Sequence, residues 1–278
     1  MADFSEGISA REYLDHRYGV RECSEPEGSG LPLDDEDFVR EWEAWLDDPE
    51  SAPSDVRDVL SDETISFRLE TTPAGRLPVA YTTSRNSFER LARMLYPGGG
   101  MTEIPASVNA FTIKAKHPDL HGHRLILLHR MGYSALSGDE MGIAEEEWIE
   151  KSRIIRLHHE ISHYFSLRVL GGMRNHALDE IAADCAGQLA AFGTFSASTQ
   201  KRFFGISEGR VLPGGRFSFY IKRLRADSTD EVLEETESAL STLENYLSRN
   251  SDMTRESARP RLITRLLAAG IRGIRDLQ

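Results

Sequence analysis

The sequence predicts an α+β protein with a small antiparallel sheet, two central helices and helical extensions at both ends. Between residues 65 and 130, short runs rich in β-branched and aromatic residues are separated by Gly, Pro and Asp, which is typical of paired strands. Residues 144–170 lack Pro and Gly and repeat apolar side chains at helical spacing, and residues 177–192 form a second helical run. We therefore expect the sheet to precede two long helices.

The length of 278 residues suits one domain with an extension at each end. We expect an acidic helical extension over residues 1–62, a core over residues 63–205 and a helical C-terminal subdomain over residues 206–278.

The N-terminal extension is strongly acidic. Residues 31–63 contain thirteen Asp or Glu against two Arg, and they account for most of the net charge of −12. Phe38, Trp42 and Trp45 recur at spacings of four and three, so a helix over residues 34–46 would have an apolar face that packs on the body of the protein. The alternative is an acidic arm that binds a basic partner or covers the candidate site. Further helices are expected over residues 10–18 and 54–60.

Two strand pairs are expected in the core. Residues 65–70 and 76–82 predict a hairpin, and residues 107–115 and 123–130 predict a second pair around a turn at His117-Pro118-Asp119. A short helix over residues 87–96, ended by Pro97 and three glycines, lies between the pairs.

The C-terminal subdomain is predicted to hold a helical pair. The two helices are expected over residues 228–248 and 254–277, the second interrupted at Pro260. Ser228 followed by Glu231 predicts a capping box at the start of the first.

The pentapeptide His159-Glu160-Ile161-Ser162-His163 has the HExxH pattern. Two histidines four residues apart on a helix present their imidazoles on one face, where a single Zn²⁺ can reach both, and the glutamate between them can act as general base. The residues therefore predict a zinc-dependent hydrolase with His159 and His163 as metal ligands and Glu160 as the base.

The second helix is predicted to complete the site. Glu180 and Asp184 share one face of it with the small residues Ala183, Gly187 and Ala191, which would let the two helices approach closely. Glu180 would be the third ligand, which leaves the fourth position open to water. Asp184 would accept a hydrogen bond from the ring nitrogen of a histidine that does not bind the metal.

These residues resemble the gluzincin metallopeptidases, in which a glutamate on a following helix completes HExxH. The segment from Asp179 to Asp184 is similar to the ExxAD pattern of the minigluzincins and of the CAAX prenyl-protease and HtpX group. The resemblance covers residues 107–191 and implies a zincin-like domain with the ligands and base given above; the membrane helices of the prenyl-protease relatives are absent.

The resemblance also implies a substrate strand and an oxyanion donor. Asn109-Ala110-Phe111 is similar to the "NAF" strand of that group and would bind an extended peptide by strand addition. Gluzincins usually place a His or Tyr from the C-terminal part at the oxyanion. His176 and Tyr220 are the candidates for this role, although His176 is more readily interpreted as a surface-loop histidine.

Composition argues against several partners and compartments. The N-terminus is acidic and polar, no run of eighteen apolar residues occurs, and Cys23 and Cys185 form no CxxC pair, so we expect a cytoplasmic protein with no membrane partner. The acidic balance gives no basic footprint for nucleic acid.

The expected function is cleavage of a peptide bond in a peptide or protein substrate. The alternatives are a regulatory metalloprotease that cleaves one specific partner, as in the ImmA/IrrE type, a zinc amide hydrolase of a small-molecule pathway, and a non-catalytic zinc-stabilised interaction module. The presence of Glu160 argues against the module, because a purely structural site needs no base.

Overall fold

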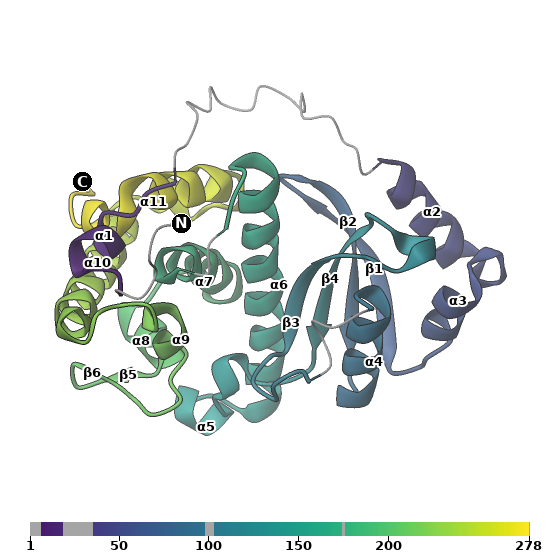
Figure 1. Ribbon diagram of the computed structural model, residues 1–278, viewed down its shortest axis with the longest axis horizontal. Helices are drawn as coiled ribbons and strands as arrows, with labels where there is room; N and C mark the ends of the chain where they lie inside the picture. Colours follow the sequence, from purple (N-terminus) through teal and green to yellow (C-terminus); the bar gives the residue numbers. More distant parts are fainter. Residues whose placement is uncertain (1–6, 19–35, 98–102, 174–175, 278) are drawn as a thin grey trace. The chain divides into compact units, whose positions relative to one another are not determined.

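Helices dominate the secondary structure of the computed structural model, and a small mixed sheet makes it an α+β protein (Figure 1). The structure describes residues 7–18, 36–97, 103–173 and 176–277. None of the helices within these ranges combines the length and apolar character needed to cross a bilayer.

The chain divides into two compact units, which are described separately. One comprises Met1–Glu22 with Ser166–Gln278, and the other comprises Cys23–Phe165. This division differs from the three predicted segments, because helix α1 (Ala10–Leu14) packs against the C-terminal helices and the remaining N-terminal helices belong with the sheet. Helix α6 (Glu145–Val169) spans the boundary without a break.

The sheet of the second unit has the strand order β1-β2-β4-β3. Its strands are β1 (Ile65–Thr72), β2 (Gly75–Thr82), β3 (Ala110–Lys114) and β4 (Arg124–His129). Both predicted antiparallel pairs are confirmed, β1 with β2 and β3 with β4. The prediction of an entirely antiparallel sheet is wrong, because β2 and β4 pair in parallel. The connection after β2, which contains helix α4 (Arg85–Leu95), puts β3 at the outer edge and β4 beside β2.

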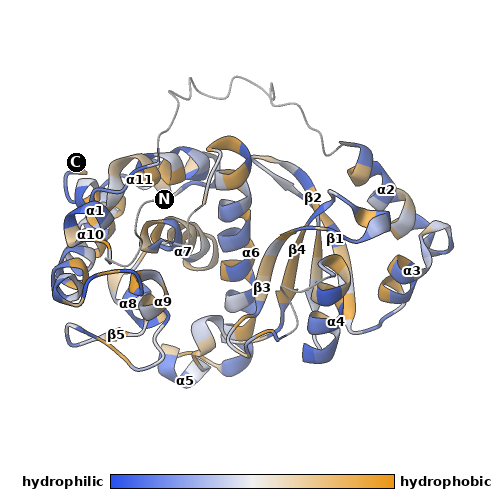
Figure 2. Cartoon of the chain, in the orientation of Figure 1, coloured by the Kyte–Doolittle hydropathy of each residue, from blue (hydrophilic) through white to orange (hydrophobic). Residues whose placement is uncertain are grey.

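Apolar side chains of the helices and the sheet form the core of this unit. Helices α2 (Glu36–Asp47) and α3 (Ser54–Leu60) contact the sheet, as does α4. Phe38, Trp42 and Trp45 are buried, and the Trp42 ring stacks on Phe67 of β1, so the apolar face predicted for α2 is confirmed. Strand β4 is largely apolar (Figure 2), in agreement with its buried side chains.

The remaining elements of this unit are short. They are helix α5 (Gly138–Met141) and the 3-10 turns η1 (Pro49–Ser51), η2 (Pro118–Leu120) and η3 (Tyr133–Ala135).

The other unit is helical around α7 (Ala177–Phe192). Its other elements are α1, α8 (Ala197–Phe204), α9 (Phe217–Ile221), α10 (Thr229–Arg249), α11 (Arg259–Ile274), the hairpin of β5 (Ile206–Ser207) and β6 (Arg210–Val211), and the turns η4 (Ala226–Ser228), η5 (Ser251–Thr254) and η6 (Glu256–Ala258). Helix α7 packs on α11, and α10 packs on α8 and α11. Nearly every α7 side chain from Ala177 to Leu189 is buried, which makes α7 the core helix of the unit.

The predicted central helices and the C-terminal helical pair are confirmed, but the capping box at Ser228 is wrong. Ser228 already has helical backbone angles, because the turn η4 leads directly into α10, and its hydroxyl donates to Asp227. Cys185 is a buried free thiol, whereas Cys23 lies outside the described residues.

Candidate metal centre

Helix α6 positions His159, Glu160 and His163. Its first turn carries Glu145, Glu146 and Glu147 and its last turn carries Arg168, charges that complement the helix dipole at each end. All three side chains of the motif are buried, with 6–8 % of their surface exposed. The long helix therefore brings its HExxH face into the protein interior.

The two imidazoles converge on one point. Their Nε2 atoms lie 2.8 Å apart, and the rings are perpendicular to each other. Two imidazole nitrogens bound to one tetrahedral zinc would lie about 3.3 Å apart, since each Zn–N bond is about 2.0–2.1 Å long. A small opening of the two rings therefore suffices for shared ligation through the two Nε2 atoms.

The other nitrogen of His159 is held by a tyrosine. The Tyr133 hydroxyl lies 2.9 Å from His159 Nδ1, and the Tyr133 ring is buried beneath the Arg156 guanidinium. The backbone N–H of Tyr133 donates to Ser152 on α6. A partner on Nδ1 fixes the ring orientation and leaves Nε2 for a metal. Sequence reasoning missed Tyr133, which has no motif of its own.

The carboxylate of Glu160 is bound to the edge strand of the sheet. Thr112 on β3 donates a hydrogen bond from Oγ1 to Glu160 Oε2 at 2.8 Å. The same hydroxyl lies 3.2 Å from the Glu160 carbonyl oxygen. This contact, also missed from the sequence, orients Glu160 from the strand that was predicted to bind substrate.

The predicted substrate residues have structural partners. Asn109 is buried, and its amide group bonds to the carbonyls of Ala106 and Ser107 and to Arg85. Phe111 stacks on Phe88 of α4, and Ala110 begins β3. The side chains of Asn109 and Phe111 therefore stabilise strand β3. The backbone edge of β3 that does not face β4 is the part suited to strand addition.

On helix α7, Glu180 and Asp184 lie one turn apart and share an arginine. Both are buried, and Arg216 Nη2 donates to Glu180 Oε2 at 3.0 Å and to Asp184 Oδ2 at 2.7 Å. The guanidinium compensates the two carboxylates in a buried environment, where an unpaired charge would be costly. Arg216 had no signal in the sequence beyond its charge.

A chain of amides extends from Asp184 to helix α8. Gln200 Nε2 donates to Asp184 Oδ2 at 2.7 Å, and Gln188 Nε2 donates to Gln200 Oε1 at 2.9 Å. The Ser196 N–H then donates to Gln188 Oε1. Both glutamines are fully buried, so this network fixes the Asp184 carboxylate. The predicted hydrogen bond of Asp184 to a histidine stays a prediction.

Tyr220 belongs to the same cluster. Arg216 Nε donates to its hydroxyl at 3.0 Å, and the hydroxyl also bonds to the Glu180 side chain. Burial and the carboxylates of Glu180 and Asp184 raise the pKa of Tyr220 well above its ordinary value, against the opposing effect of Arg216. Tyr220 therefore stays a protonated donor, which is the form that its predicted role requires.

His176 is a buried helix cap and not a surface-loop histidine. Its Nδ1 accepts a hydrogen bond from the Leu178 N–H at 3.1 Å, so Nε2 carries the proton and donates to the Tyr13 carbonyl at 3.1 Å. The ring stacks on Tyr13, with centroids 3.8 Å apart. Because both nitrogens are engaged, these contacts favour a structural role over the predicted oxyanion role.

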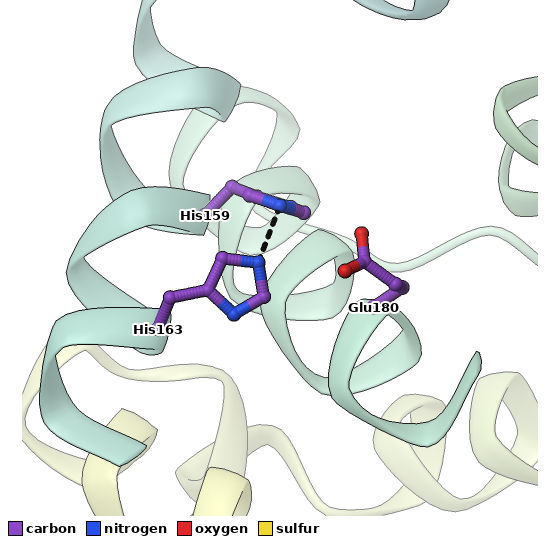
Figure 3. A group of neighbouring side chains, drawn as sticks. All are labelled: His159, His163 and Glu180. Atoms are coloured by element: carbon purple, nitrogen blue, oxygen red, sulfur yellow. Dashed lines mark hydrogen bonds between the residues drawn. The ribbon is translucent and has the colours of Figure 1, made fainter. Parts of the chain in front are cut away.

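The ligand atoms of His159, His163 and Glu180 lie within 4.8 Å of one another, and all three residues are buried. Figure 3 shows their side chains directed toward one another. Two imidazoles and one carboxylate form a donor set that suits borderline divalent metals, of which zinc is one. The buried group could therefore hold a metal ion.

Comparison with protein families gives one match. The model of DUF7005, described as a family of unknown function, matches residues 109–271, which is more than half of the chain. The matched range contains the three possible metal ligands, Glu160 and Arg216. Comparisons with curated proteins and with solved structures found no match. The chain belongs to DUF7005, a family of unknown function.

Proposed function

We propose that the protein is a zinc-dependent hydrolase of the gluzincin type that cleaves a peptide bond in a peptide or protein substrate. The observation that carries the proposal is the convergence of His159, His163 and Glu180 beside the intervening Glu160 of the HExxH motif. Zinc bound by this donor set would polarise the substrate carbonyl and lower the pKa of a coordinated water to about 7.

Glu160 supplies the base and the acid of the reaction. Its carboxylate accepts a proton from the attacking water and later delivers it to the leaving amine. Thr112 bonds to one carboxylate oxygen, Oε2, and the other oxygen remains for proton transfer. Tyr133 orients His159 through Nδ1.

A protonated donor near the ligand cluster would stabilise the negative charge on the substrate oxygen. Tyr220 is the better of the two predicted candidates, because its protonated hydroxyl lies in the Glu180 and Arg216 cluster. Metal binding by Glu180 would release that hydroxyl to the substrate oxygen. His176 caps α7 through Nδ1 and donates from Nε2 to the Tyr13 carbonyl, so both ring nitrogens are engaged.

A peptide is favoured over a small amide because Thr112 links the base to an edge strand. Within the described residues, strand β3 pairs with β4 alone, so its second edge offers backbone donors and acceptors to an extended chain. An extended substrate bound there would run beside the residue that holds Glu160.

The decisive experiment compares wild type with Glu160→Gln and with Glu147→Gln, an exposed glutamate of the same helix, as the matched control. Zinc content, melting temperature and hydrolysis of a peptide library are measured on each protein. We expect about one zinc per chain in all three, and a loss of about 10²- to 10⁴-fold in hydrolysis only for Glu160→Gln.

Two results would contradict the proposal. Equal hydrolysis by wild type and Glu160→Gln would exclude Glu160 as the base. Undiminished zinc in His163→Ala or Glu180→Ala would exclude the ligand set, which is tested by elemental analysis without any turnover.

A further inference from the structure

Helix α9 has two different sides. Arg216, which precedes the helix, and Tyr220 within it both bond to the Glu180 cluster. Phe219, the residue before Tyr220, is 61 % exposed. Most of this aromatic side chain therefore faces solvent, on a helix whose other residues support a possible metal ligand.

Cationic side chains flank Phe219. Lys222 continues the helical backbone of α9, and Lys222 and Arg223 are both exposed. Lys222, three residues after Phe219 and still helical in its backbone angles, is its neighbour on the helical surface. Arg223 follows in the turn after the helix.

The N-terminal segment pairs a second exposed apolar residue, Ile8, with the backbone that follows α9. The Ile8 N–H donates to the Arg223 carbonyl at 2.7 Å, and the Arg225 N–H donates to the Ile8 carbonyl at 3.0 Å. Ile8 is 37 % exposed. We call Ile8, Phe219, Lys222 and Arg223 the α9 surface.

The α9 surface differs in charge from the rest of the protein. Residues 201–225 contain seven Lys or Arg and one Glu, although the whole chain has a net charge of −12. The next long helix, α10, contains six acidic residues and one Arg. A local basic and apolar surface in an acidic protein attracts an acidic segment that carries an apolar side chain.

We propose that the α9 surface binds an acidic segment of the protein substrate, with an apolar side chain of that segment on Phe219 and its carboxylates on Lys222 and Arg223. This rests on the proposed function, because α9 is linked to the cleavage site through Arg216, Tyr220 and Glu180. A peptide is favoured over an anionic bilayer because the whole chain has a net charge of −12, which repels an extended anionic surface more than one short acidic segment.

Binding is tested without turnover, in the full-length Glu160→Gln protein. The probes are a short labelled peptide with glutamates around one leucine and one phenylalanine, and the same peptide with lysine at each glutamate position. Fluorescence anisotropy is measured at low and high salt. We expect the acidic peptide to bind more tightly than the lysine peptide and to lose affinity as salt is added.

Variants locate the binding site. Lys222→Glu with Arg223→Glu, and separately Phe219→Ala, should each weaken binding of the acidic peptide by about tenfold or more. The matched control reverses two exposed arginines elsewhere, Arg249→Glu with Arg261→Glu, which changes the net charge equally and should alter binding by less than about twofold.

Equal affinity for both peptides, no binding of the acidic peptide, or no effect of the α9 variants would overturn the assignment. Binding to anionic phospholipid vesicles that depends on Phe219, without peptide binding, would assign the surface to lipid instead. If the wild-type protein hydrolyses peptides with zinc but shows no preference for acidic ones, only the α9 assignment is refuted. If it binds the acidic peptide through the α9 surface but hydrolyses nothing, only the proposed function is refuted.

Discussion

Thr112 on β3 donates a hydrogen bond to the carboxylate of Glu160 on α6, 48 residues further along the chain. The bond connects the edge strand of the sheet to the glutamate of the HExxH motif. Any shift of β3, for instance when a peptide pairs with its edge, would therefore move the hydroxyl that orients this carboxylate. If a peptide pairs with β3 as proposed, its binding and the position of Glu160 would be coupled through Thr112.

Replacing Thr112 with valine should lower hydrolysis by about 10- to 100-fold, because valine has the same shape but lacks the hydroxyl that bonds to a charged group. Zinc content should not change, since Thr112 bonds to the proposed base and not to a ligand. Thr112→Ser keeps the hydroxyl and should retain most of the activity. A valine variant as active as wild type would show that the bond does not position Glu160.

Replacing Arg216 with leucine leaves Glu180 and Asp184 without their shared guanidinium. In the metal-free protein this should reduce the free energy of unfolding by about 3–5 kcal/mol. In Arg216→Leu, added zinc supplies the positive charge that the two carboxylates lack, and no arginine competes with it for Glu180. Zinc should therefore raise the melting temperature by more in Arg216→Leu than in wild type.

The measurement is thermal unfolding of wild type, Arg216→Leu and the exposed control Arg249→Leu, each with a chelator and with zinc. Arg216→Lys keeps the charge but not the planar group that reaches three side chains. Its zinc-induced rise in melting temperature should therefore lie between those of wild type and Arg216→Leu. An identical zinc-induced shift in wild type and Arg216→Leu would exclude competition between the arginine and the metal.

The sequence was most informative where a pattern is local. The helix over residues 177–192 was predicted with its observed bounds, and α6 to within one residue at each end, because apolar periodicity and glycine stops act within the helix itself. Tyr133, Thr112 and Arg216 were missed, since their partners lie 26, 48 and 36 residues away in the sequence. No spacing rule links such positions.

The parallel pairing of β2 and β4 was missed for a related reason. Hairpin turns specify which neighbours pair, but nothing in the sequence of one strand specifies its non-consecutive partner. Helices α8 and α9, of eight and five residues, were also missed. The capping box at Ser228 failed because a 3-10 turn continues into the helix there.

His176→Ala should cost about 1 kcal/mol of stability, because the variant loses the side-chain acceptor for the Leu178 N–H at the start of α7. His176→Asn keeps an acceptor and should lose less. Zinc content and the rate of hydrolysis should stay near wild type in both, as both ring nitrogens have structural partners. If His176→Asn were stable and loaded with zinc but inactive, His176 would act on the substrate.

His123 gives the protein a defined dependence of stability on pH. Its ring lies against Phe38 and Trp45, and burial lowers its pKa from the ordinary 6.5 to about 4. Its Nε2 is 3.3 Å from the carboxylate of Glu41, but that side chain is half exposed and does not offset the burial. The folded protein therefore keeps His123 neutral where the unfolded chain binds a proton.

The protein loses stability as the pH falls, because the pKa of His123 is lower in the folded protein than in the unfolded chain. Below pH 6.5 the unfolded chain takes up a proton at residue 123 that the folded protein does not take up until about pH 4, so stability is lost as the pH falls through this window and changes no further below it. His123→Phe preserves the aromatic packing and removes the titration, whereas His121→Gln changes an exposed histidine two residues away. Urea unfolding midpoints measured across the window should fall less steeply for His123→Phe than for wild type or His121→Gln. Parallel curves for all three proteins would show that folding does not lower the pKa of His123.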